Sequence, residues 1–139
     1  MNCVFCEILH GRAPAIRIYE DDDFLSFLDI RPFAPGHTLV IPKNHSADLT
    51  DTPAETVAGL MAVGSRIARA ARIGLGATGT NIAINDGKSA FQSVFHIHLH
   101  VVPRQDRDRV SFLAGMLLRR DPDRETSGAR LRAGLDALA

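Results

Sequence analysis

The sequence predicts an α+β fold in which antiparallel strands and helices form one domain. Short apolar segments bounded by turn residues lie at 37–42, 80–85 and 94–102, and each has the length of a strand. One long segment, 50–76, instead repeats its apolar residues at helical spacing. The length of 139 residues suits a single domain, and 45% of the residues are hydrophobic, which is enough for a core.

The N-terminal part predicts a short helix followed by a pair of strands. Residues 3–10 precede Gly11, a natural helix stop, so this helix carries both cysteines near its start. Apolar residues at 16–18 and 24–28 flank the acidic run EDDD at 20–23. That arrangement is typical of two antiparallel strands joined by a polar turn.

Prolines and polar residues bound the later strands. Pro42 limits the strand at 37–42. The polar loop DGKSAFQS (86–93) leads into the strand VFHIHLHVV (94–102), which we expect to end at Pro103.

The segment 50–76 is the clearest helix of the sequence. Thr52 can be its N-cap, Pro53 its first helical residue and Glu55 the reciprocal partner of a capping box. The apolar side chains that recur at helical spacing are Val57, Leu60, Met61, Ile67, Ala68 and Ala71.

The C-terminal part changes character after residue 104. Residues 105–139 are rich in Arg and Asp and contain no long apolar run, although 111–118 and 129–138 can form short helices. We therefore divide the chain into a main domain at 1–104 and a C-terminal extension at 105–139 that packs on the same domain or flanks it.

Composition argues against several classes of protein. Basic and acidic residues number 16 each, and the zero net charge disfavours a dedicated nucleic-acid or membrane-surface protein. With no secretory signal and no apolar stretch near the ~20 residues of a membrane span, we expect a soluble cytoplasmic protein. In that reducing compartment Cys3 and Cys6 should not form a structural disulfide, and their C-x-x-C spacing leaves zinc, redox chemistry or coincidence.

Three of the six histidines lie within five residues. His96, His98 and His100 alternate with apolar residues, so on a strand they share one face. The outer two are about 13 Å apart along a straight strand, whereas zinc–nitrogen bonds are about 2.0–2.1 Å long. One metal therefore cannot easily take all three, and the spacing suggests separate tasks for the ends and the centre. A polar strand face is the alternative, but chance rarely produces so regular an alternation.

The loop before these histidines, 86–93, is rich in small and polar groups. Such a loop can direct backbone N–H groups at phosphate oxygens. A neutral imidazole facing the loop is a competent nucleophile toward phosphorus, because it needs no deprotonation near pH 7. Attack would give a covalent phospho-histidine intermediate that water then releases.

Several motifs together resemble the histidine triad (HIT) family. HIHLHVV (96–102) is similar to the family signature His-φ-His-φ-His-φ-φ, where φ is apolar, and the stretches 19–45 and 85–96 are similar to its other motifs. The likeness covers about residues 3–104. It implies a five-stranded antiparallel sheet with two main helices, usually in a homodimer, and hydrolysis or transfer at the α-phosphate of nucleotides.

The resemblance also implies roles for the catalytic residues. His98 matches the nucleophile that takes the nucleotidyl group, and His100 and His37 match the histidines that support it and the phosphate. Loop residues match positions that contact phosphate oxygens and the leaving group. The implied catalytic set is His98, His100, His37, Ser93 and Gln92.

The nucleotide site is implied in the same way. Asp29 matches the acidic residue that holds the ribose hydroxyls, although alone it could be an ordinary turn residue. The apolar positions match a purine pocket and are also candidates for ordinary core. The implied nucleotide-binding set is Phe5, Ile8, Phe27, Leu28, Asp29, Ile30, Asn85, Gln92, Ser93, His98 and His100.

One position departs from the family pattern. The family often has a glycine before the loop glutamine, where this chain has Phe91. If that position needs a positive φ, phenylalanine is strained there and the loop can differ. The departure bears on leaving-group specificity more than on the chemistry.

The C-x-x-C motif gains meaning from the resemblance. In several bacterial members of the family, such a motif joins a histidine after I-P-K-x and the first histidine of the triad. The implied site holds structural zinc, since four protein ligands leave no open position for water. Two buried free cysteines are the alternative. The ligands would be Cys3, Cys6, His45 and His96.

The sequence thus favours an enzyme, with other functions left open. The leading hypothesis is hydrolysis of a purine nucleoside 5′-phosphoramidate or dinucleotide polyphosphate through a nucleotidyl–His98 intermediate. Nucleotidyl transfer to an acceptor such as phosphate shares the same first step. A nucleotide-binding regulatory protein with vestigial catalysis, or a catalytic metal site, are the alternatives from other classes.

Overall fold

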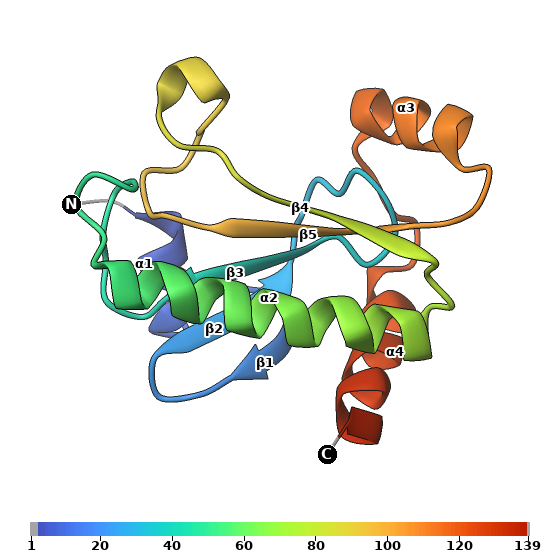
Figure 1. Ribbon diagram of the computed structural model, residues 1–139, viewed down its shortest axis with the longest axis horizontal. Helices are drawn as coiled ribbons and strands as arrows, with labels where there is room; N and C mark the ends of the chain where they lie inside the picture. Colours follow the sequence, from blue (N-terminus) through green and yellow to red (C-terminus); the bar gives the residue numbers. More distant parts are fainter. Residues whose placement is uncertain (1–2, 139) are drawn as a thin grey trace.

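A five-stranded antiparallel sheet lies at the centre of the computed structural model, which describes residues 3–138. Its strand order is β1–β2–β3–β5–β4 (Figure 1). The expected α+β class and antiparallel sheet are confirmed. The strands are β1 (Arg17–Glu20), β2 (Phe24–Leu28), β3 (Thr38–Pro42), β4 (Gly79–Ile84) and β5 (Leu99–Arg104).

Four α-helices and one short 3-10 helix accompany the sheet within the described residues. The short N-terminal helix and the long central helix appear where the sequence predicts them, and the C-terminal region adds two more. The helices are α1 (Val4–Leu9), α2 (Ala54–Gly74), α3 (Arg109–Leu118), α4 (Arg124–Leu138) and the 3-10 helix η1 (Lys88–Ala90).

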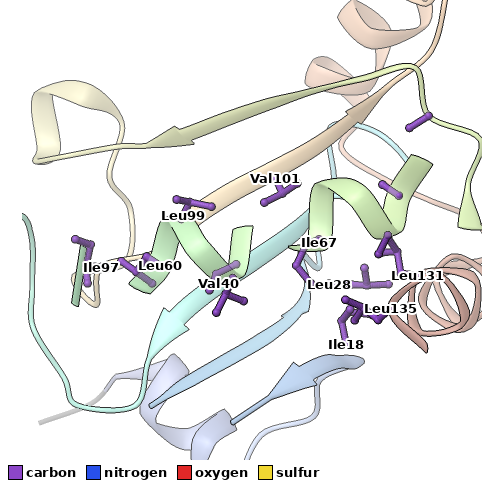
Figure 2. Close-up of a cluster of buried hydrophobic side chains, with 14 residues drawn as sticks. Ile18, Leu28, Val40, Leu60, Ile67, Ile97, Leu99, Val101, Leu131 and Leu135 are labelled. Carbon is purple, nitrogen blue, oxygen red and sulfur yellow. The ribbon is translucent and has the colours of Figure 1, made fainter. Parts of the chain in front are cut away.

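The main hydrophobic core lies between one face of the sheet and helices α2 and α4 (Figure 2). Leu99 and Val101 of β5 point into this core together with Leu131 of α4. Because side chains alternate along a strand, His100 points to the opposite face, where helix α1 packs. We call this second side the triad face. The helix layer thus buries one side of the sheet and leaves the other side for the functional residues.

The C-terminal helix α4 is part of this same core. A Cβ at Gly134 of α4 would overlap the carbonyl oxygen of Ala70 in α2, and a Cβ at Gly74 of α2 would overlap the carbonyl oxygen of Arg130 in α4. The two backbones therefore approach more closely than side chains would allow. The division of the chain at residue 104 stays a prediction.

The capping box expected at the start of α2 is not formed. The helix begins at Ala54, with Pro53 as its N-cap and no side-chain cap. The Thr52 hydroxyl instead donates to the carbonyl oxygen of Asp48 at 2.6 Å. Met61, predicted among the helical apolar set, is 47% exposed, because the apolar face of this helix centres on buried residues such as Leu60, Val63 and Ile67.

The histidine-bearing strand is shorter at its start than predicted. Strand β5 begins at Leu99, so His96 and His98 precede it. Pairing with β3 ends at Val40, opposite Leu99. Continuation would soon reach Pro42, which has no N–H to donate. Pro103 does not end β5 but lies within it, paired with Thr80 of β4.

Two further expectations concern membrane spans and the oligomeric state. No helix within residues 3–138 is both long and apolar enough to cross a membrane. The homodimer implied by the family resemblance is a property of two chains and stays a prediction.

Candidate functional site

The candidate site forms on the triad face, around the start of β5. The ring of Phe5, from helix α1, packs edge-on against two histidine rings, with centroids 5.9 Å from His96 and 5.1 Å from His98. The rings of His98 and His100 lie 4.9 Å apart. The three alternating histidines therefore stay on one side of the chain although regular strand geometry begins only at Leu99.

His98 is held with one ring nitrogen free. Its Nδ1 lies 2.8 Å from the carbonyl oxygen of His96. A carbonyl oxygen only accepts, so Nδ1 carries the proton and Nε2 keeps a lone pair. His98 is 5% exposed, and this burial lowers the pKa of its imidazole, so the neutral form dominates at pH 7.

His37 and His100 form a directional chain of hydrogen bonds, which we call the relay. The N–H of Phe33 donates to Nδ1 of His37 at 3.0 Å, so the proton of neutral His37 lies on Nε2. Nε2 of His37 lies 3.0 Å from Nδ1 of His100 and donates to it. The proton of neutral His100 then lies on Nε2, a buried atom with no partner among residues 3–138.

Both relay histidines stay neutral near pH 7. Burial lowers the pKa of His37 to about 3, and burial also lowers the pKa of His100 to about 3. The 3.6 Å approach between Nε2 of His37 and Oδ2 of Asp29 is therefore not an ion pair at neutral pH. The site presents a lone pair on one histidine beside an N–H donor on the next.

Asp29, His37 and His100 lie close enough together to suggest a metal group. The facing nitrogens of the two histidines are, however, already engaged as donor and acceptor. The second nitrogen of His37 is taken by Phe33. We therefore interpret these residues as the relay and its neighbouring carboxylate, and the geometry gives no support to a catalytic metal at this place.

The implied base pocket is only partly assembled. Phe5, Ile8 and Phe27 come together on the triad face, with the Phe5 and Phe27 rings 5.4 Å apart. Leu28 does not join them, because its side chain lies on the opposite face of the sheet, in the core beneath α2 and α4. Ile30 is 74% exposed and can contact a base only at the rim.

The loop after β4 carries the other implied residues. Asn85 is half-buried directly after the strand and Ser93 is exposed. Gln92 is buried, and its side chain is committed to backbone groups: Oε1 accepts from Gly87, and Nε2 donates to Ala47 and Val94. The expected contact of the Gln92 amide with phosphate is thus not supported, because this amide fixes the loop itself.

Phe91 adopts the backbone conformation that favours glycine. Its φ is +70° and its ψ is +20°, a region that costs an ordinary residue about 1–2 kcal/mol. The side chain is 87% exposed, so core packing does not offset this strain. The strained loop that the sequence predicts is therefore present, next to the residues implied in phosphate binding.

The four expected metal ligands converge at the N-terminal end of the site. The Nδ1 of His96 lies 3.4 Å from Sγ of Cys3, 3.6 Å from Sγ of Cys6 and 3.1 Å from Nδ1 of His45. Sγ of Cys6 lies 3.4 Å from Nδ1 of His45. The Nε2–H of His96 donates to the carbonyl oxygen of Pro42 at 2.8 Å, which leaves Nδ1 as the free lone pair.

These donors fit a tetrahedral zinc ion. Bonds of about 2.0–2.3 Å place the ligand atoms of such an ion roughly 3.3–3.8 Å apart, close to the observed separations. Burial, followed by the neighbouring Cys3, raises the pKa of the Cys6 thiol, so two adjacent thiolates here need a cation. The donor set of two sulfurs and two nitrogens is typical of closed, structural zinc sites.

Phe33 takes part in the relay, and the sequence does not reveal this. It lies in the loop RPFAPG, and nothing in that pattern distinguishes it from an ordinary apolar residue. Its role comes from its backbone N–H, which sets the direction of the relay. A main-chain donor leaves no signature in the residue type, so only the structure could identify it.

Comparison with known proteins agrees with this geometry. The model of the HIT domain matches residues 10–107. An uncharacterized HIT-like protein of Mycobacterium tuberculosis is 62% identical over 135 residues, 97% of this chain and 94% of that protein. The adenosine 5′-monophosphoramidase of Saccharomyces cerevisiae is 38% identical over 104 residues, 75% of this chain and 63% of that enzyme.

A solved structure extends the agreement to the whole chain. The crystal structure of a zinc-bound histidine triad family protein from Mycobacterium smegmatis is 70% identical, with a TM-score of 0.92 over 99% of this chain and 96% of that one. The family match covers well over half of the sequence and includes the triad itself. The chain belongs to the histidine triad (HIT) family.

Proposed function

We propose that this protein is a nucleotide hydrolase that acts at the α-phosphate of a purine nucleoside 5′-phosphoramidate or dinucleotide polyphosphate. One observation carries the proposal: the ring of His98, with a lone pair on Nε2, lies 4.9 Å from the ring of His100, whose buried Nε2–H has no partner among the described residues. A phosphoryl group between them would meet a nucleophile and a hydrogen-bond donor together. The name of the yeast relative, an adenosine 5′-monophosphoramidase, supports this class of substrate.

The chemistry follows from these positions. Nε2 of His98 attacks the α-phosphorus, a phosphorus–nitrogen bond to the ring forms, and the bond to the leaving group breaks as that group takes up a proton from solvent. The His96 carbonyl oxygen, which accepts from Nδ1–H of His98, stabilises the positive charge that the ring gains. Water then attacks phosphorus, the bond to Nε2 breaks, and a nucleoside monophosphate leaves.

The surrounding residues support the same assignment. Nε2–H of His100 would donate to a phosphoryl oxygen, a contact that strengthens as charge develops in the transition state. Ser93 is exposed near the start of the histidine stretch, where it can meet the leaving group. Asp29 keeps one oxygen on the N–H of Arg31 at 2.9 Å and can offer the other to ribose hydroxyls.

We also propose that Cys3, Cys6, His45 and His96 bind structural zinc. The separations of their donor atoms and the closed set of four ligands support this proposal. Bound there, zinc would cross-link helix α1 to the loop that follows β3 and to the first histidine of the triad. Its four protein ligands leave no position for a reacting water.

The experiment is release of AMP from adenosine 5′-phosphoramidate by the purified protein and by a His98→Ala variant that circular dichroism shows to be folded. We expect release by the wild type and a loss of at least about 10³-fold in the variant, since the covalent route is removed. Equal release by both proteins would refute the proposal, as would a wild type that releases AMP neither from the phosphoramidate nor from a diadenosine polyphosphate. His10→Ala is the matched control, because it removes an exposed histidine at the end of α1, outside the candidate site, and it should retain most of the activity.

A further inference from the structure

Helix α3 reaches the candidate site although it lies beyond residues 10–107, the stretch matched by the HIT domain. Arg119, the residue that ends this helix, makes two contacts with the loop between β2 and β3. Its Nε donates to the carbonyl oxygen of Arg31 at 2.9 Å. Its guanidinium carbon lies 4.2 Å from the centre of the Phe33 ring, a distance typical of a cation–π contact.

The loop that Arg119 contacts is the one that sets the relay. Phe33 donates its backbone N–H to Nδ1 of His37, and its ring packs against the His37 ring with centroids 5.1 Å apart. The same turn holds Asp29, whose Oδ1 accepts from the N–H of Arg31. Arg119 therefore contacts the two residues that connect this loop to His37 and to Asp29.

The contact depends on a close approach of helix α3. A Cβ at Gly115 would overlap the carbonyl oxygen of Phe33, so glycine allows the helix to lie against the loop. The Phe112 ring packs edge-on against Phe33 with centroids 6.3 Å apart. Arg119 has φ +54°, which an ordinary residue adopts at a cost, and its N–H donates to the carbonyl oxygen of Gly115.

We propose that Arg119 is a positioning residue for catalysis. It holds Phe33 so that the main-chain N–H stays on Nδ1 of His37, which keeps the proton of His37 on Nε2 and therefore the proton of His100 on Nε2. The positive charge of Arg119 also disfavours protonated His37, in addition to burial, which is the larger cause of its lowered pKa. The inference rests on the proposed function of His100 as a phosphate donor.

Loss of this contact has a defined chemical consequence. Without the Phe33 donor, His37 can move its proton to Nδ1, and its Nε2 can then no longer donate to His100. His100 would in turn place its proton on Nδ1, and a phosphoryl oxygen would face a lone pair instead of a donor. The change lowers kcat more than it raises KM, because the donor matters most in the transition state.

The test compares Arg119→Ala and Gly115→Ala with Leu117→Ala as the matched control. Leu117 lies on the same helix, but its side chain is 86% exposed. For the two test variants we expect kcat for AMP release from adenosine 5′-phosphoramidate to fall by about ten- to a hundredfold, less than the ~10²–10³ typical when a donor is removed outright. The control should be unchanged.

A spectroscopic readout separates positioning from general stability. In protein labelled with ¹⁵N-histidine, the wild type should show neutral His37 and His100 with the proton on Nε2. Both test variants should show a mixture of this tautomer and the neutral tautomer with the proton on Nδ1. A lowered kcat with unchanged tautomers, or an unchanged kcat, would overturn the inference. The tautomers are measured without substrate, so absence of AMP release by the wild type would count against the proposed function and not against this contact.

Discussion

Each histidine of the triad uses its two ring nitrogens differently. The Nε2–H of His96 donates to the Pro42 carbonyl oxygen, and its Nδ1 faces the cysteines. The Nδ1–H of His98 donates to the His96 carbonyl oxygen, which leaves a lone pair on Nε2. His100 accepts at Nδ1, and its Nε2–H has no partner in the part of the chain that the structure describes. Three identical side chains are thus prepared for the three proposed roles of metal ligand, nucleophile and donor, because the partner of the other nitrogen differs.

The sequence could predict that these histidines lie on one side of the chain, but not which ring nitrogen of each carries the proton. Alternation along the chain indicates that they share a side, and the family resemblance implies their roles. Which nitrogen carries the proton depends on partners distant in sequence, such as the carbonyl oxygen of Pro42 and the N–H of Phe33. Backbone groups are the same in every residue, so the sequence alone gives no access to this level of detail.

Phe91 provides a prediction at the scale of one residue. Phe91→Gly should stabilise the fold by up to about 1 kcal/mol, because relief of the left-handed strain exceeds the entropic cost of glycine and the lost side chain is 87% exposed. Chemical denaturation of the purified proteins measures the difference in the free energy of unfolding.

Ala90→Gly is the matched control for this substitution. Ala90 directly precedes Phe91 and ends η1, and it is not among the described residues with positive φ. Glycine there brings its entropic cost without relief of strain, so this variant should be less stable than the wild type. A Phe91→Gly protein that loses as much stability as Ala90→Gly would contradict the argument from backbone strain.

At the scale of elements, helices α2 and α4 meet through their backbones. Gly134 faces the carbonyl oxygen of Ala70, and Gly74 faces the carbonyl oxygen of Arg130. Nε of Arg130 donates to the Gly74 carbonyl oxygen at 3.0 Å, which adds a polar contact at the same crossing. Close backbone packing and a hydrogen bond therefore stabilise the position of the C-terminal helix, in addition to the burial of Leu131.

Gly134→Ala should destabilise the protein by about 1–3 kcal/mol. The added methyl would force the two backbones apart, and this overpacking cost exceeds the gain of about 1 kcal/mol that alanine normally brings to a helix. Thermal unfolding followed by circular dichroism gives the change. Gly79→Ala is the comparison, since a Cβ at Gly79 meets no atom within 4 Å. Equal stability of the two variants would show that the helices do not depend on this close approach.

The elements that the sequence misplaced have local physical reasons. Thr52 resembles an N-cap in the sequence, but its hydroxyl is taken by the turn at Asp48. The strand with the histidines starts late because β3 ends in Pro42, beyond which no regular ladder is available. Periodicity identifies long elements well, but their ends depend on which neighbour supplies the last hydrogen bonds.

At the scale of the whole molecule, the cysteine–histidine cluster connects distant parts of the chain. Cys3 and Cys6 come from the start of α1, His45 follows β3, and His96 precedes β5. The sequence indicated this cluster only through the family resemblance, since spacing alone left zinc, redox chemistry or coincidence. A bound ion would fix α1, and with it Phe5, against the triad.

Removal of metal should therefore lower stability. Dialysis against a chelator, or Cys6→Ser, should lower Tm by on the order of 10 °C, since loss of a ligand present at about a thousandfold excess over its Kd removes about 4 kcal/mol. Metal analysis before and after dialysis, with re-addition of zinc, accompanies the thermal measurement.

His10→Ala is the matched control for the cluster. His10 lies at the end of the same helix α1 but is not among the four convergent residues. We expect its variant to keep both the metal and its response to the chelator. If chelation left Tm unchanged in a wild type shown to contain zinc, the cluster would not be a structural site.

The residue His96 takes part in two sites at once. Its ring serves the cysteine cluster, while its carbonyl oxygen holds the proton of His98 in place. A change at the cysteine cluster that moves the backbone of residue 96 would therefore also move the hydrogen-bond acceptor of His98. A descendant of this chain that lost its cysteines would still have to keep this carbonyl oxygen oriented by other packing, but any residue type at position 96 could supply it, so the backbone path should outlast the histidine side chain.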